Sequence, residues 1–192
     1  DQTFRKFITE IKTRLKNNDH EMYPYIGTYA YCMMRLGVQD KELWELLEQK
    51  IGEDQFYTNF KEATYACEGF VMLQLFNDQK RIDAVYKRLE RIVNLTIWEV
   101  NMLYYKRLAE AFVAVNRFGS AMFQKLEQHI MSNLAMEYEI ETMVDILLAF
   151  YKSGNGSKDF YHAMQVTMVK GHLFNKNILL ENRLELPFNG RV

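Results

Sequence analysis

Apolar residues recur at intervals of three and four along most of the chain, which is the period of an amphipathic helix. Short segments rich in Gly, Asn, Asp and Lys separate the periodic stretches, for example LGVQDK, FNDQK and KSGNGSKD. Such residues favour turns and helix caps. Only two prolines are present, each near an end of the sequence. The pattern therefore predicts an all-α fold of short helices, each about 12 to 20 residues long.

The predicted helices recur in a regular order. Four stretches, LWELLEQKI, VYKRLERIV, MFQKLEQHI and FYHAMQVTM, each carry an aromatic residue three positions before a large apolar one. The aromatic residues are Trp44, Tyr86, Phe123 and Tyr161, so successive copies follow at nearly even intervals. Each copy follows a helix that ends in an apolar run. We interpret this as a helix-turn-helix unit of roughly 40 residues.

A stack of such units buries a continuous core only by contact between neighbours, as in an α-solenoid. We therefore predict a right-handed α-solenoid of about four repeats, in one domain that spans residues 1–192. The approximate repeats are 23–60, 61–98, 99–136 and 137–176, and they are compatible with one stretch of a longer array. Trp44 is expected to be a core residue, with a ligand-facing role as the alternative.

The stretch YAYCMMRLGVQDKELWELLEQKI ends one helix in Leu-Gly and passes through an Asp-containing turn into a helix with Leu-Leu. In this respect it resembles the degenerate repeats of mitochondrial helical proteins of the FAST-kinase-like and heptatricopeptide type. The resemblance implies a mitochondrial location and a role in organellar RNA metabolism or as an accessory subunit. The C-terminal stretch NKNILLENRLELPFNGRV is far shorter than the RAP domain of such families, which weakens the implication of RNA processing.

No pattern in the sequence is typical of a catalytic or metal site. The four histidines are scattered, and neither HExxH nor CxxC occurs. The acidic run EYEIE has no base or nucleophile beside it and is interpreted as a solvated helix start. In SGNGSKD we predict that Gly154 ends one helix and that Ser157 or Asp159 caps the next, rather than a phosphate-binding loop. We expect no enzyme activity, cofactor, metal or small-molecule substrate.

Composition limits the possible partners. The chain has 24 Lys and Arg against 25 Asp and Glu, so no overall charge attracts nucleic acid or an anionic membrane. No apolar run approaches the length of about 18 residues that a membrane span needs, and we expect an intracellular, soluble protein. Cys32 and Cys67 lie in apolar runs, where buried free thiols are expected.

Local basic residues leave RNA binding open. Lys80, Lys87 and Arg91 share one face of a predicted helix, because they are spaced by seven and four. A second basic pair follows two tyrosines, whose rings would stack on bases. These residues are Tyr104, Tyr105, Lys106 and Arg107. The acidic stretch 40–54 argues against a continuous basic groove, and a solvated helix face is the alternative.

Protein binding accounts better for the remaining residues. The chain holds 13 Phe, 12 Tyr, 2 Trp and 11 Met, which exceeds what thin two-layer repeats need for their own core. Aromatic residues and Met are favoured at protein interfaces. We predict a non-enzymatic scaffold or accessory subunit that binds other proteins in a large mitochondrial assembly. The alternative is an organellar RNA-binding helical-repeat protein that acts in RNA processing, stability or ribosome assembly.

Overall fold

The computed structural model describes residues 2–53, 59–97, 101–119, 121–134 and 139–172. The C-terminal stretch 175–192 and the first two residues of EYEIE lie outside these ranges. Within them every regular element is a helix, which confirms the predicted all-α class for the described part of the chain. The elements are α1 (Gln2–Lys16), η1 (His20–Tyr25), α2 (Ile26–Arg35), α3 (Lys41–Gly52), α4 (Phe60–Gly69), η2 (Phe70–Phe76), α5 (Gln79–Thr96), α6 (Met102–Ala114), α7 (Ala121–Ser132), α8 (Ile140–Ser153) and α9 (Lys158–His172), where η marks a 3-10 helix.

Short polar side chains fix where several helices begin. Asp40, Asn59, Asp78 and Asn101 each accept a hydrogen bond from the backbone N–H three residues further on. Each bond satisfies one of the N–H groups that the first turn of a helix leaves without a partner inside the helix. Asp40, Asn59 and Asp78 lie in turn segments that the sequence predicts, whereas no turn segment was predicted at Asn101.

Residues in the left-handed backbone conformation follow η2 and four of the α-helices. They have φ between 52° and 69°: Asn18, Gly37, Asn77, Asn116 and Gly154. Glycine and asparagine adopt this conformation at the lowest cost. Gly154 therefore ends α8 as predicted. The predicted cap of α9 is confirmed too, because the Ser157 hydroxyl accepts a hydrogen bond from the N–H of Phe160 at 3.1 Å.

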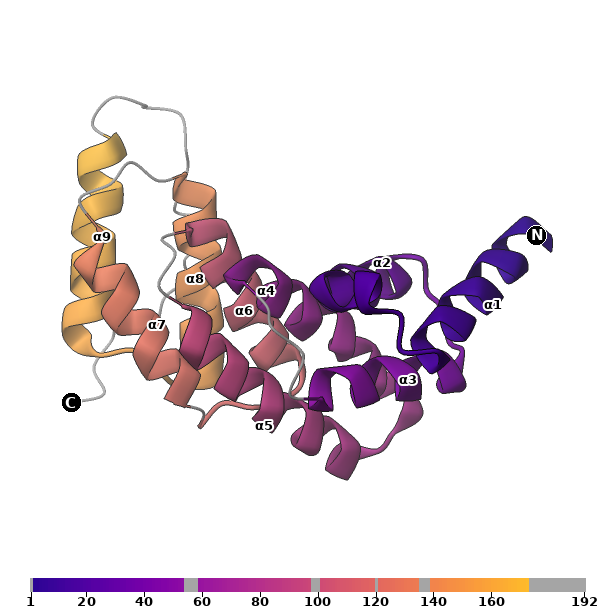
Figure 1. Ribbon diagram of the computed structural model, residues 1–192. Helices are drawn as coiled ribbons and strands as arrows, with labels where there is room; N and C mark the ends of the chain where they lie inside the picture. Colours follow the sequence, from indigo (N-terminus) through magenta and orange to yellow (C-terminus); the bar gives the residue numbers. More distant parts are fainter. Residues whose placement is uncertain (1, 54–58, 98–100, 120, 135–138, 173–192) are drawn as a thin grey trace.

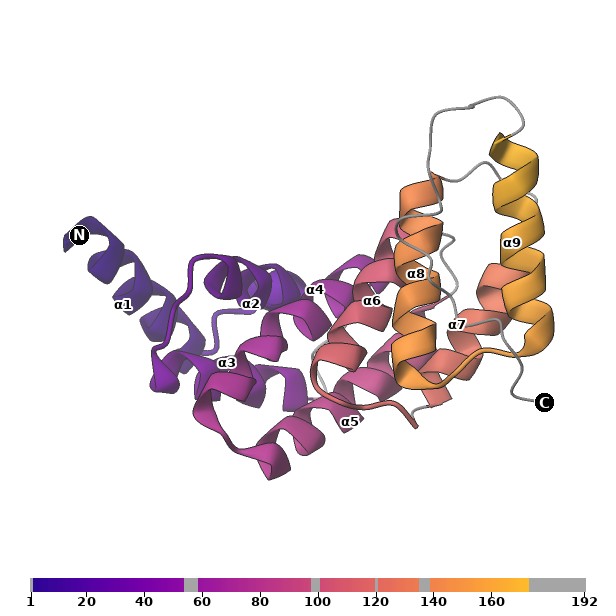
Figure 2. The ribbon, with the colours of Figure 1, turned by 180° about the vertical axis from the view of Figure 1, so that it is seen from behind.

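The helices form two layers. In one layer α4 packs against α2 and α6, and α8 packs against α6. In the other, α1, α3, α5, α7 and α9 contact one another in that order. Figure 1 shows α5 and α7 in front of α6 and α8, and Figure 2 shows the same layers from behind. Within each layer, two neighbouring helices are therefore separated along the chain by one helix of the other layer.

The backbones of α2 and α4 approach each other closely at two glycines. A Cβ atom on Gly27 would lie 2.0 Å from the carbonyl oxygen of Glu62, and one on Gly69 would lie 2.4 Å from the carbonyl carbon of Ala30. Only residues without a side chain fit at such positions. Because residue numbers rise together in both helices along this contact, α2 and α4 run parallel.

The array is bent. In Figure 1, α1 at one end and α8 with α9 at the other rise on the same side of α2 and α4. This side is therefore the concave edge of the molecule, and the end of η2 together with the start of α5 lies on the opposite edge (Figure 1).

Pairs of buried aromatic rings recur between the layers. In each pair a ring of the second layer meets, edge to face, a ring that stands later in the chain, at nearly the same sequence separation each time. The pairs are Trp44 with Phe70 (5.6 Å between ring centroids), Tyr86 with Phe112 (5.3 Å) and Phe123 with Phe150 (5.2 Å). All six rings are fully buried, and the Trp44 indole N–H donates to the Val38 carbonyl at 2.7 Å. The predicted core role of Trp44 is therefore confirmed.

Tyr161 occupies the same position in α9 but is only partly buried. Its helix follows the common pattern, because Phe160, Met164 and Met168 are buried at intervals of four, as Leu43, Leu47 and Ile51 are in α3. The difference lies in the covering helix. Within the described residues no first-layer helix follows α9, so no ring corresponds to Phe70 at this end of the array.

The two cysteines differ in environment. Cys67 is fully buried as predicted, and this burial raises the pKa of its thiol. Cys32 is exposed, so the prediction for it is wrong. The reason is the helix face: the buried residues of α2 form the stripe Ile26, Ala30 and Met33, and Cys32 lies off this stripe.

Candidate functional site

The three basic residues predicted on α5 are exposed. Lys80, Lys87 and Arg91 form no ion pair with any residue that the structure describes. The acidic residues of α5 are directed elsewhere: Asp83 and Glu90 lie 3.5 and 3.3 Å from the Arg117 guanidinium. The exposed charge of this helix is therefore mainly positive.

Lys106 and Arg107 lie in the other layer and are paired. The Lys106 ammonium is 2.6 Å from the Asp145 carboxylate on α8, and this hydrogen bond raises the pKa of Lys106. Arg107 is 3.3 Å from the Glu68 carboxylate on α4. Both residues thus connect α6 to its neighbours in the layer.

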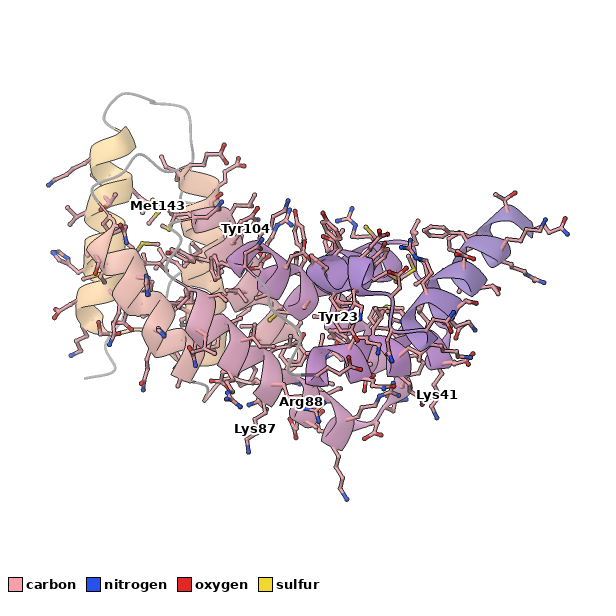
Figure 3. The ribbon with its side chains drawn as sticks, viewed as in Figure 1. Tyr23, Lys41, Lys87, Arg88, Tyr104 and Met143 are labelled. Atoms are coloured by element: carbon pink, nitrogen blue, oxygen red, sulfur yellow. The ribbon has the colours of Figure 1, made fainter. Side chains whose placement is uncertain are left out.

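The five predicted basic residues do not form one patch. Figure 3 shows Lys87 and Arg88 on the lower edge of the molecule and Tyr104, close in sequence to Lys106, near the upper, concave edge. Tyr105 is fully buried against Phe60 and has no free face for a base. Of the two predicted stacking rings, only Tyr104 reaches the surface.

A row of tyrosines crosses three helices of the first layer. Tyr31 on α2 stacks on Tyr65 on α4, with ring centroids 5.0 Å apart and planes 15° apart. Tyr104 on α6 meets the edge of Tyr65 at 6.2 Å. Each ring is partly exposed. Neighbouring parallel helices thus contribute one surface tyrosine each.

Cations surround these rings. The Arg107 guanidinium lies 5.6 Å from the centroid of Tyr31 and 5.5 Å from that of Tyr65, within the range of cation–π attraction. Arg35 lies 5.9 Å from Tyr31, and Lys61 lies 5.7 Å from Tyr65. We call this surface the tyrosine strip; it consists of Tyr31, Arg35, Lys61, Tyr65, Tyr104 and Arg107.

The surroundings of the strip are partly dehydrated. Burial raises the pKa of Glu68, and the neighbouring Arg107 opposes this shift without cancelling it. Burial also raises the pKa of Glu110, one turn after Lys106 on α6.

The strip was not predicted from the sequence. Tyr31, Tyr65 and Tyr104 stand far apart along the chain, in stretches that are otherwise dissimilar. One signal was present: each tyrosine belongs to the first helix of a unit. That signal becomes useful only when it is known which residues of neighbouring parallel helices lie side by side.

In the part of the chain that the structure describes, no group of three or more His, Cys, Asp or Glu side chains is placed to hold a metal ion. A surface pocket of 310 Å³ lies between α5 and the connection from α6 to α7, and Arg117 at its wall is already paired with Asp83 and Glu90. Its lining is Asp83, Glu90, Asn116, Arg117, Phe118, Gly119 and Ala121, which contains neither histidine nor cysteine.

Comparison with protein-family models, curated protein sequences and solved structures finds no match to the chain. In the part of the chain that the structure describes, no helix has the length and hydropathy needed to cross a membrane.

Proposed function

We propose that the chain is a right-handed α-solenoid of about four helix-turn-helix repeats and that it acts as a non-enzymatic scaffold or accessory subunit in a larger protein assembly. Two features support the solenoid. Parallel neighbours in each layer come from alternating helices of the chain. The buried aromatic pairs recur with nearly constant spacing.

The observation that carries the scaffold function is the uncovered apolar surface at both ends of the described array. In α1, Phe4 and Phe7 are 37% and 48% exposed, whereas Ile8 and Ile11 on the same stripe are buried. At the other end, Val169 is 57% exposed on α9, the helix that also carries the partly exposed Tyr161. Apolar and aromatic side chains left at the open ends of stacked helices are stabilised when another polypeptide covers them.

Purification of native, untagged complexes tests this proposal. Bound protein and bound RNA are quantified before and after ribonuclease treatment. The scaffold function predicts that protein partners remain in a stoichiometric ratio after the RNA is removed. Recovery of the chain alone, or loss of all partners with the RNA, would contradict it.

A pair of variants locates the contact. Phe4→Asp with Phe7→Asp is expected to release a partner bound at the α1 end, because burying a carboxylate in an apolar interface is unfavourable. Arg5→Asp with Lys6→Asp is the control on the same helix turns, since both side chains are exposed. Circular dichroism confirms that each variant retains its helices.

RNA binding is the second candidate, and the unpaired cations of α5 favour it. Lys80, Lys87 and Arg91 are free for phosphate contacts among the described residues, whereas Lys106 and Arg107 would first have to leave their carboxylate partners. Binding should weaken with salt, and each lost phosphate contact should reduce the slope of log K against log salt by about 0.7 for a single strand. Lys87→Glu with Arg91→Glu tests this, with Arg5→Glu and Lys6→Glu as the control of equal charge change.

We place the assembly in mitochondria on the resemblance to mitochondrial helical-repeat proteins alone. Fractionation of the cells that produce the protein tests this location. Recovery of the native protein outside the mitochondrial fraction would refute it and would leave the scaffold function open.

A further inference from the structure

We propose that the tyrosine strip is the docking site for an extended acidic segment of a partner protein, in which carboxylates flank an aromatic or aliphatic side chain. The proposal rests on the scaffold function and specifies the chemistry of one partner. Its basis is the position of two cations, on either side of the stacked tyrosines, that form no ion pair with the residues that the structure describes.

The geometry of α2 and α4 sets this arrangement. The two helices run parallel, and Tyr31 stacks on Tyr65 across them. Arg35 lies one turn after Tyr31, and Lys61 lies one turn before Tyr65. The two cations therefore flank the ring pair on opposite sides along the helix direction.

The charges of the strip are not balanced. Glu68 pairs with Arg107, and Asp145 pairs with the adjacent Lys106. Arg35 and Lys61 are exposed, and neither forms an ion pair with a described residue. Arg35 attracts Glu68 only weakly, from beyond ion-pair distance. A ligand with two separated carboxylates would complement these two positions.

The composition and location of the strip suit a protein segment. Tyrosine and arginine are the side chains that most often carry binding energy at protein interfaces. Tyr104 lies near the concave edge (Figure 3), where an extended chain crossing parallel helices would contact α2, α4 and α6 in turn. Each helix offers one ring for packing.

A nucleic acid fits less well. The stacked faces of Tyr31 and Tyr65 are occupied by each other, so bases cannot insert between them. A phosphate backbone also carries a charge at every nucleotide and would meet Glu110 and Asp145 beside the strip. A peptide can place its carboxylates at Arg35 and Lys61 only.

Fluorescence anisotropy tests the proposal with the whole chain and three labelled probes. The probes are a peptide in which two separated glutamates flank a tyrosine, the same peptide with lysines in place of the glutamates, and single-stranded oligouridine. The acidic peptide should bind at about 0.15 M salt, where the Debye length is about 8 Å, and the basic peptide should not. Tighter binding of the RNA than of the acidic peptide, lost with the strip variants below, would overturn the proposal in favour of a nucleic-acid site.

Charge-reversal variants locate the contact. Arg35→Glu with Lys61→Glu should weaken binding of the acidic peptide by roughly tenfold or more, as expected for the loss of two charge pairs. Lys87→Glu with Arg91→Glu changes the net charge equally on α5 and should have less than about a twofold effect, because exposed charges beyond a Debye length are screened. Arg35→Gln with Lys61→Gln provides a second pair that adds no repulsive charge. Equal losses in both regions would show nonspecific attraction and refute the site.

The native complexes separate this inference from the scaffold function. If Arg35→Glu with Lys61→Glu releases one protein partner and Lys87→Glu with Arg91→Glu releases none, both proposals are supported. If the partners all remain with the strip variant, the docking site is wrong and the scaffold function stands. If the unaltered chain has no protein partner, the scaffold function itself fails.

Discussion

Two junctions between neighbouring helices are built in different ways. Between α2 and α4 the backbones touch at Gly27 and Gly69, and the buried Glu62 accepts hydrogen bonds from the N–H and hydroxyl of Thr28 at 2.8 and 2.6 Å. Between α1 and α3 the polar contacts are ion pairs at the surface. Lys12 and Lys16 reach Glu42 at 2.9 and 2.5 Å.

The difference follows from position in the array. The α2–α4 junction packs on α3 and α5 of the other layer, and shape and buried hydrogen bonds hold it. The α1–α3 junction lies at an end, where solvent screens its charges and where Phe4 and Phe7 remain exposed. We therefore expect the α2–α4 junction to tolerate salt but not changes in volume, and the α1 end to lose stability in salt and acid but to tolerate changes in volume.

The largest effect is expected at the buried aromatic pairs. Trp44→Ala should lower the free energy of unfolding by about 3–5 kcal/mol, because it leaves a cavity against Phe70 and removes the bond to Val38. Tyr161→Ala, at the corresponding position of α9, should cost only about 1 kcal/mol because its ring is already partly exposed. Urea unfolding measures both. Equal losses would show that the two positions are equally covered in solution.

Glycine replacement comes next. Gly69→Val should lower the free energy of unfolding by about 2–3 kcal/mol, because its side chain would force α4 away from Ala30. Gly119→Val is the matched control, since a Cβ atom there meets nothing within 4 Å. Thermal unfolding followed by circular dichroism measures the shift. A neutral Gly69→Val would mean that α2 and α4 do not touch.

A smaller effect is expected for the buried carboxylate. Glu62→Gln keeps the size of the side chain but removes one of the two acceptors for Thr28. We expect a loss of about 1–2 kcal/mol in the free energy of unfolding, the usual effect of leaving a buried donor with a weakened bond. Glu141→Gln, at an exposed position in the first turn of α8, should change stability by less than about 0.5 kcal/mol.

The smallest effect concerns acid and the α1 end. Lys12 and Lys16 lower the pKa of Glu42 from 4.5 to about 2. The contribution of this carboxylate is therefore complete above pH 4.5 and is lost as the pH falls from 4.5 toward 2. Hydrogen exchange should show protection of α1 falling over this range. In Glu42→Gln the same range should have less effect, and an unchanged pH dependence would rule out this ion-pair network.

Local patterns explain what could be predicted. Asp40 and Ser157 precede helices, and Gly154 follows one, because their side chains or backbones satisfy helix ends within three residues. Trp44 and Tyr86 fall on apolar stripes, so their burial follows from helical period alone. The recurrence of these aromatic positions is a sequence property, and three of the four recurring rings, Trp44, Tyr86 and Phe123, are fully buried.

Other features depend on neighbours that the local pattern does not name. Lys106 and Arg107 look like free cations in the sequence, but their partners Asp145 and Glu68 each stand 39 residues away. A single stretch does not show which charges are paired, because pairing depends on which helices lie beside it.

Local sequence alone specifies the helices, their ends and the stripe of each helix that packs inward, because periodicity and capping act over a few residues. The packing of the helices sets which charges are neutralised, which tyrosines align across α2, α4 and α6, and why Tyr161 lacks the cover that Trp44 has. These outcomes depend on the register of the parallel helices, that is, on which residues of neighbouring helices lie side by side. That register is set by backbone contacts at residues such as Gly27 and Gly69, whose partners Glu62 and Ala30 lie on a different helix, far away along the chain.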